Sequence, residues 1–232
     1  MNTLGIIGGM SPASTTTYYD QINQIVNQAK GGNTTAPVIV YSVEFGEIVA
    51  CQKSGDWQKA AEILGNAAQK LEQIGAKAVL IATNTMHKVA DEVQRAVNIP
   101  LIHIIDTTAT AIKQQGLSKV ALLGTAFVIQ QDFYKDGLAK RGVQAVVPNE
   151  ADQAEIHRII FDELCVGKVL PESKAFFLSV IEKLQQQGIE GVILGCTEIG
   201  LLIQQADSSL PFFDTAELHA KAAAEFVLGV DN

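Results

Sequence analysis

The sequence predicts an α/β protein made of two similar lobes, each a mostly parallel sheet flanked by helices. Short apolar runs rich in β-branched residues alternate along the 232 residues with longer segments whose apolar residues recur at helical spacing. This alternation is typical of βαβ units. The pattern also repeats, since Thr83 and Cys196 follow matching apolar runs 113 positions apart (196 − 83), and Gly8 and Gly124 follow another pair 116 apart (124 − 8). Offsets near half the chain indicate a duplication at domain scale.

The first half is predicted to contain four strands joined by helices. An apolar run at 4–7 ends in a Gly-Gly-Met-Ser turn, and the helix that follows stops at the Gly-Gly pair of 31–32. A long helix starts near Ser54, with apolar residues spaced by four and three, and stops at Gly75. The other expected elements are a strand at 37–43, a loop and short helix at 44–52, a strand at 78–82, a helix through Val89, Val93 and Val97, and an apolar strand at 101–105.

The second half repeats this order. The run at 120–123 leads into Gly124 and Thr125 as the first run leads into Gly8 and Gly9, and an aromatic pair follows each turn. Further elements are expected as a strand at 145–147, helices at 151–166 and 172–187, a strand at 192–194, a strand around Phe212 and a helix at 218–227.

The similarity of residues 210–215 to residues 99–107 suggests that the chain returns to the first lobe at its end. We therefore expect a first lobe of 1–114 plus 209–232 and a second lobe of 115–208. If the lobes are related by pseudo-twofold symmetry, the site lies between them.

The composition excludes several classes of protein. A net charge of −8 and a pI of about 5.0 argue against a nucleic-acid partner, which requires clustered basic residues. With 47% hydrophobic and 18% charged residues, a sizeable core is expected. The sequence has neither a long apolar span nor a secretory leader, so we expect a cytoplasmic protein with no membrane partner. Its three widely spaced cysteines read as reduced thiols, with no metal site predicted.

Four turns at strand ends are candidates for a binding site, because ligands of open parallel sheets bind at the carboxyl ends of the strands. Each turn places small or hydroxyl side chains and free N–H groups at a helix start, which favours a carboxylate over a cation. The turns lack both the dinucleotide fingerprint and the phosphate-loop pattern, so nucleotide binding has little support. They lie at 8–11, 83–85, 124–125 and 195–198.

Cys196 is the strongest chemical candidate, because it stands between a buried strand and a helix start. A helix N-terminus lowers a thiol pKa from about 8.5, which predicts a thiolate near neutral pH. The competing interpretation is a cysteine that is merely buried. Cys51 and Cys165 are interpreted as packing residues and His103 as a core histidine within a strand. The remaining histidines lie on predicted helices with no partner at ligand spacing; they are His87, His157 and His219.

On these residues the sequence resembles the aspartate/glutamate racemase family over essentially the whole chain. The motifs are the 8–11 turn with Ser14 and Thr15, the Thr-Asn-Thr-Met-His-Lys segment at 83–88, and the Gly-Cys-Thr-Glu-Ile-Gly segment at 195–200. The resemblance implies cofactor-independent racemisation by two cysteines on opposite faces of the substrate α-carbon, since inversion needs an acid and a base on opposite sides. Cys196 occupies the second cysteine position. Thr83 replaces the first.

This replacement implies an unequal pair, because a hydroxyl is a far weaker acid than a thiol. Thr83 or a bound water would complete the side opposite Cys196, and the enzyme would be kinetically biased toward one enantiomer of aspartate or glutamate. The resemblance further implies substrate-binding roles for Met10, Ser11, Gln52, Asn84, Thr85, Thr125, Lys168, Thr197 and Glu198, with Glu47 as another candidate.

Two other functions stay open at the level of the sequence. One is a related cysteine-dependent isomerase or decarboxylase of small dicarboxylic acids, and the other is an inactive amino-acid-binding protein, since a fold alone does not fix function. The expected small-molecule partner is an acidic amino acid, and a homodimer is expected because twofold dimers are the commonest closed assembly.

Overall fold

The computed structural model describes residues 1–230, which divide into two compact units. Unit 1 contains Met1–Ile104 and the C-terminal segment that begins at His219, and unit 2 is Ile105–Leu218. Residues 105–114 and 209–218, which we expected in the first lobe, lie in unit 2. The first of these segments forms most of a helix that packs within unit 2, and the second contains a strand of the sheet of unit 2.

Unit 1 is built on four parallel strands in the order β2-β1-β3-β4. The strands are β1 (Leu4–Gly8), β2 (Val38–Ser42), β3 (Ala78–Ile81) and β4 (Leu101–Ile102). Burial explains their composition, since β1 and β3 are buried along their whole length and carry only aliphatic residues and glycine.

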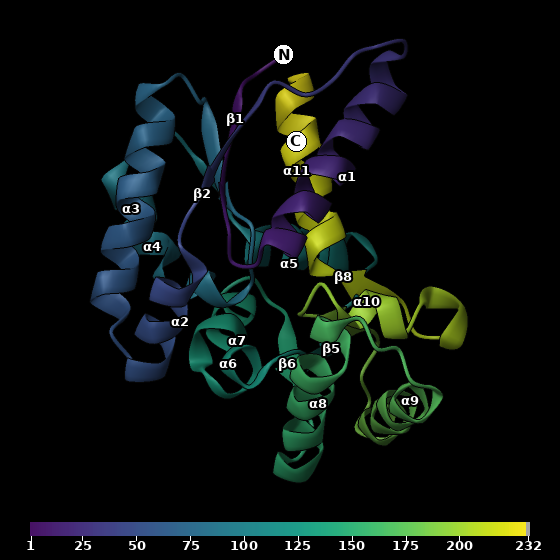
Figure 1. Cartoon of the computed structure of the whole chain (residues 1–232). Coiled ribbons are helices and arrows are strands. Elements are labelled where there is room, and N and C mark those ends of the chain that lie inside the picture. Colours follow the sequence, from purple (N-terminus) through teal and green to yellow (C-terminus); the bar gives the residue numbers. More distant parts are fainter. Residues whose placement is uncertain (231–232) are drawn as a thin grey trace. The chain divides into compact units, whose positions relative to one another are not determined.

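Helices lie on both faces of this sheet. Ile7, Val79 and Ile81 pack into one hydrophobic cluster with α3 (Trp57–Gln73) and α4 (Ala90–Ala96). On the other side, α1 (Pro12–Lys30) and α11 (Thr215–Leu228) run side by side (Figure 1). The short helices α2 (Phe45–Ser54) and η1 (Thr85–Val89) follow β2 and β3.

Unit 2 repeats the arrangement with four parallel strands in the order β6-β5-β7-β8. They are β5 (Lys119–Leu123), β6 (Gln144–Val146), β7 (Val192–Leu194) and β8 (Phe212–Asp214). Its helices are α5 (Ile104–Gln114), α6 (Ala126–Gln130), α7 (Asp132–Ala139), α8 (Glu150–Asp162), η2 (Leu164–Val166), α9 (Pro171–Gln185), α10 (Ile199–Leu202) and η3 (Gln205–Asp207). The predicted fold class, two similar α/β lobes with parallel sheets, is confirmed.

Three predicted elements differ from those observed. The apolar run at 101–105 is a strand only over Leu101–Ile102, because α5 already begins at Ile104. The single helix expected after β3 is divided into η1 and α4, and the one expected at 151–166 ends at Asp162 before η2. Apolar periodicity thus located these segments without resolving their breaks. No helix within residues 1–230 combines the length and apolarity needed to cross a membrane.

Candidate functional site

The glycine turn after β1 is shaped by close backbone approach. Gly9 has φ +92°, and a Cβ at this position would lie 2.4 Å from the carbonyl oxygen of Val43, so no other residue fits without a shift. The Gly9 N–H donates to Thr15 Oγ1 at 2.8 Å, and Ser11 Oγ accepts the Ser14 N–H at 3.2 Å as the N-cap of α1. The turn therefore holds Met10 buried and Ser11 half-buried at the carboxyl edge of the sheet of unit 1.

Thr83 lies at the same edge, two residues beyond the end of β3. The hydroxyl of Ser14 donates to the carbonyl of Ala82 at 3.0 Å, which ties the start of α1 to the chain just before Thr83. The amide of Gln52 donates to Met86 Sδ at 3.3 Å. Asn84 is buried, whereas Thr83 and Thr85 are half-buried. The structure thus gathers the predicted residues of unit 1 around the ends of two adjacent strands, β1 and β3.

In unit 2 the corresponding edge carries Thr125 and Cys196. The strands β5 and β7 are neighbours, and the Gly195 N–H donates to the carbonyl of Leu123 at 2.7 Å. A Cβ on Gly195 would lie 2.7 Å from the same oxygen, so glycine allows the two strand ends to approach closely. Thr125 is the N-cap residue of α6, and its buried Oγ1 makes no hydrogen bond with any described residue.

The Cys196 thiol is held by Glu198. Its Sγ–H donates to Glu198 Oε2 at 3.0 Å, and the Thr197 hydroxyl donates to the same oxygen at 2.6 Å. Burial first, and then the charge of Glu198, raise the pKa of the Cys196 thiol well above its ordinary value. The expected lowering of this pKa is therefore wrong. The helix that follows, α10, has only four residues, so its dipole is outweighed by desolvation and by the carboxylate.

Two groups near this pair were not recognised in the sequence as part of the site. Burial raises the pKa of Asp214 to about 6, although its Oδ1 accepts two backbone N–H groups at the start of α11, and the charges of Glu217 and then Glu198 add to the shift. Cys165 is exposed overall, but partial desolvation of its thiol, followed by the charge of Glu198, raises its pKa to about 11. The signal for Asp214 was the repeated Asp-Thr pair at 106–107 and 214–215; Cys165 had no such signal.

The other cysteines and the outlying candidates behave differently from one another. Cys51 is buried in the core of unit 1, as predicted, whereas Cys165 is exposed and is not a packing residue. Glu47 and Lys168 have exposed side chains on α2 and on the loop before α9. Their contact with a substrate stays a prediction.

Three histidines form a cluster in unit 1, which the sequence analysis missed. The ring centroids of His87 and His103 are 4.7 Å apart, and those of His87 and His219 are 5.4 Å apart. His87 Nδ1 lies 2.8 Å from the carbonyl oxygen of Thr83, so the cluster contacts the candidate site through its backbone. His87 and His219 are buried, and His103 is partly exposed and lies outside any strand. The nearest sequence signal was the i, i+4 spacing of Thr83 and His87.

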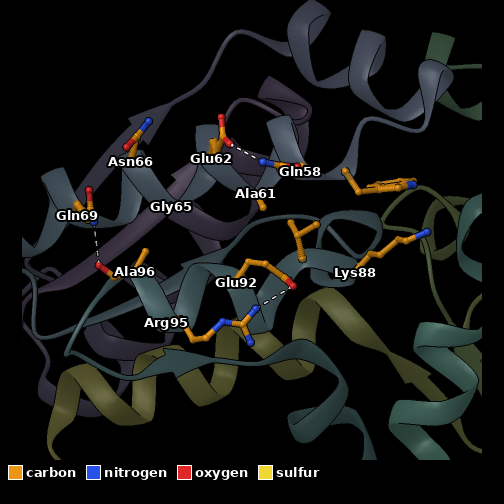
Figure 2. Close-up of a pocket in the computed structure, with 12 residues that line it drawn as sticks. Gln58, Ala61, Glu62, Gly65, Asn66, Gln69, Lys88, Glu92, Arg95 and Ala96 are labelled. Carbon is orange, nitrogen blue, oxygen red and sulfur yellow. Dashed lines mark hydrogen bonds and ion pairs between the residues drawn. The ribbon is translucent and has the colours of Figure 1, made fainter.

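A separate groove of about 850 Å³ runs between α3 and α4. Figure 2 shows its amide and charged side chains, including Asn66, Gln69 and the ion pair of Glu92 with Arg95 at 3.0 Å. At one end the Lys88 ammonium lies 4.1 Å from the ring centroid of Trp57. None of the predicted site residues lines this groove, so its size does not mark the candidate site.

Comparison with known proteins adds to this geometry. The model of the family described as Asp/Glu/Hydantoin racemase matches residues 7–223. The broad specificity amino-acid racemase RacX of Bacillus subtilis is 25% identical over 228 residues, covering 97% of this chain and 98% of the relative.

Solved structures agree with this match. A putative Asp/Glu racemase from Yersinia pestis is 48% identical with a TM-score of 0.95, and the alignment covers 98% of this chain and 100% of that one. An aspartate racemase homologue from Pyrococcus horikoshii is 41% identical with a TM-score of 0.88, again over 98% of this chain and 100% of that one.

Proposed function

We propose that this chain, which belongs to the Asp/Glu/hydantoin racemase family, racemises aspartate, glutamate or both. Membership of this family makes the chain an isomerase of the racemase type. In this proposal the enzyme uses no cofactor, Cys196 and Thr83 exchange protons with the α-carbon, and the rates differ between the enantiomers. The names of the similar proteins support an amino-acid substrate, and several of them name aspartate or glutamate.

One observation carries the assignment of the two residues. Cys196 stands two residues beyond β7, the third strand in the order β6-β5-β7-β8, and Thr83 stands two residues beyond β3, the third strand in the order β2-β1-β3-β4. The two side chains therefore hold equivalent positions in duplicated units. Racemisation requires such a pair, because the proton leaves one face of the α-carbon and returns to the other.

Glu198 supplies the step that the raised pKa of Cys196 makes necessary. At rest Cys196 is a thiol whose proton is already directed at Glu198 Oε2. Transfer of that proton to the carboxylate leaves a thiolate and a neutral carboxylic acid. The thiolate then removes the α-proton, and Thr83 or a bound water donates a proton to the opposite face and recovers it from Glu198 through solvent. In the opposite direction the same transfers run in reverse, so Thr83 or the bound water takes the α-proton and the Cys196 thiol gives its proton to the carbanion. Thr197, which shares Oε2, keeps the carboxylate oriented toward the sulfur.

The hydroxyl and amide groups at the two strand edges suit the substrate carboxylates. Thr125 carries a buried hydroxyl oxygen at the N-cap of α6, and Asn84 and Thr85 lie at the start of η1. Such donors would stabilise the negative charge that develops as the α-proton leaves. Met10, Ser11 and Gln52 complete the unit 1 edge in this proposal, and Lys168 is assigned to the distal carboxylate.

The test is α-proton exchange of L- and D-aspartate and L- and D-glutamate in deuterated water, followed by NMR with chiral analysis of the product. The wild type should incorporate deuterium and invert configuration, and Cys196→Ala should abolish exchange. Cys196→Ser is the matched control, since it keeps a hydrogen bond to Glu198 with a weaker acid. Normal exchange in Cys196→Ala would refute the assigned role.

Thr83→Cys tests the other side of the pair. A thiol there should raise exchange from the enantiomer that the wild type uses poorly by about tenfold or more, because a general acid–base group contributes about 10² to 10⁴. An unchanged ratio of the two enantiomers would exclude Thr83 as the facing group. The same incubations separate the alternatives, since a decarboxylase or another isomerase gives a different product and a binding protein gives none.

A further inference from the structure

We propose that His87 is a positioning residue for Thr83, a neutral imidazole with its proton on Nδ1 that fixes the turn after β3 by bonding backbone groups on both sides of its ring. This inference rests on the role proposed for Thr83. His87 is buried and contacts the backbone of that residue, so we assign it an action through the turn.

The hydrogen-bond partners of His87 determine where its proton is. Nδ1 lies 2.8 Å from the carbonyl oxygen of Thr83, which can only accept, so Nδ1 carries the proton. Nε2 lies 3.2 Å from the backbone N–H of Ile104, which can only donate, so Nε2 is bare. A second proton on the ring would face that N–H and break the contact. Only one form of the ring, the neutral Nδ1–H tautomer, satisfies both partners.

The contact with Ile104 has a structural reason of its own. Ile104 is the first residue of α5, and the first N–H groups of a helix have no acceptor within the helix. His87 supplies that acceptor. One ring therefore joins the Thr83 turn to the point where β4 gives way to α5.

His219 fixes the other side of the same bend. Its Nε2 lies 2.8 Å from the carbonyl oxygen of Ile102 and its Nδ1 lies 2.8 Å from the hydroxyl of Tyr18. The carbonyl requires a proton on Nε2, so His219 holds the opposite tautomer and Tyr18 donates to Nδ1. The rings of His219 and His87 thus make hydrogen bonds with the backbone of Ile102 and Ile104, the residues on either side of His103.

Electrostatics keep both rings neutral. Burial, and then the neighbouring His103 and His219, lower the pKa of His87 well below its ordinary value, and burial first lowers the pKa of His219 to about 4. No carboxylate contributes to either shift. The rings of His87 and His219 therefore stay uncharged throughout the neutral pH range.

Two substitutions divide the functions of the ring. His87→Asn places an amide N–H near the position of Nδ1 and should keep the bond to Thr83 while losing the one to Ile104. His87→Gln reaches further and can present its oxygen to Ile104 while losing the bond to Thr83. The matched control is Gln94→Ala, because Gln94 likewise makes two backbone bonds, to Ile99 and Leu101, at the other end of β4.

The readouts are kcat and KM for α-proton exchange, thermal stability, and the protonation state of the ring nitrogens from long-range ¹H–¹⁵N spectra. We expect His87→Gln to lower kcat by about 10- to 100-fold with a smaller change in KM, since misplacement of a reacting group by about 1 Å costs rates of this order. His87→Asn should keep most of kcat and lose stability. Gln94→Ala should lose stability with kcat unchanged.

Two results would overturn the inference. One is a His87 ring protonated on Nε2 at neutral pH. The other is a kcat that follows thermal stability equally in all three variants. Absence of α-proton exchange in the wild type would instead refute the proposed function. The ¹H–¹⁵N spectra would still decide whether His87 carries its proton on Nδ1.

Discussion

Lowering the pH should reduce the free energy of unfolding of unit 1, because His87 and His219 are buried in it. The variant His219→Gln tests the contribution of one of these two histidines. Burial lowers the pKa of His219 from 6.5 to about 4 in the folded protein. Below pH 6.5 the unfolded chain therefore binds a proton that the folded chain refuses, so stability falls as the pH falls. A shift from 6.5 to about 4 corresponds to about 3.5 kcal/mol when complete, at about 1.4 kcal/mol per pKa unit.

The quantity to measure is the difference in the free energy of unfolding between the wild type and His219→Gln as a function of pH. At pH 7.5 the wild type should be more stable than His219→Gln, because glutamine replaces at most one of the two hydrogen bonds of the ring. Between pH 7.5 and 4.5 this advantage should shrink by roughly 2 to 3 kcal/mol, since only the wild type carries the titrating ring. Tyr18→Phe is the control, because it removes a bond to His219 and leaves the ring in place.

The assay is urea unfolding followed by tryptophan fluorescence at a series of pH values. Trp57 is the only tryptophan of the chain and lies on α3, so the signal reports unit 1. An advantage that stays constant between pH 7.5 and 4.5 would refute the lowered pKa of His219. An advantage that grows in acid would show that the sign is opposite.

Three further predictions concern single residues. Asp214→Asn should stabilise the protein at pH 7.5 by up to about 3 kcal/mol, because folding raises the pKa of Asp214 from 3.8 to about 6 and the charged carboxylate is therefore destabilising above that pKa. Denaturant titrations in which the gain of the variant over the wild type is no larger at pH 7.5 than at pH 4 would contradict this. Gly9→Ala should lower the free energy of unfolding by about 2 kcal/mol or more in thermal melts, because of its φ and the clash with Val43, and a melt like that of the wild type would show that the turn adapts. Glu198→Gln should slow α-proton exchange from the enantiomer that reacts with the Cys196 thiolate by about 10²-fold, and should lower kcat/KM for racemisation equally in both directions because the enantiomers have equal free energies. Unchanged α-proton exchange would argue against proton acceptance by Glu198.

The fold was predictable because its signals are local. Apolar runs such as Val192–Leu194 and amphipathic segments such as Trp57–Gln73 state their own secondary structure, and their alternation dictates parallel sheets. The duplication visible from Thr83 and Cys196 appears in the structure as two sheets with the same strand order. Breaks within apolar segments, such as the one at His103 between β4 and α5, involve side chains from elsewhere in the chain and were missed.

The electrostatic state of the site was not predictable from the sequence. A cysteine at a helix start suggested a thiolate, but the sequence does not state that the helix is one turn long or that Glu198 turns back toward the sulfur. Asp214 lies 18 positions from Cys196 (214 − 196) and is brought to the same edge only by the pairing of β7 with β8. Burial and neighbouring charge, which set the pKa values of these groups, are tertiary quantities.

The sequence by itself determined the alternation of strands with helices, the duplication and the two strand ends that carry Cys196 and Thr83, because each depends on local spacing and residue type. Only the tertiary structure decided that Cys196 is a thiol hydrogen-bonded to Glu198. It also decided that the rings of His87, His103 and His219 pack together, with His87 bonded to the backbone of Thr83. Residues as far apart as Tyr18 and His219 become hydrogen-bonded partners only when α1 and α11 pack side by side. Desolvation and the choice of tautomer follow from that packing.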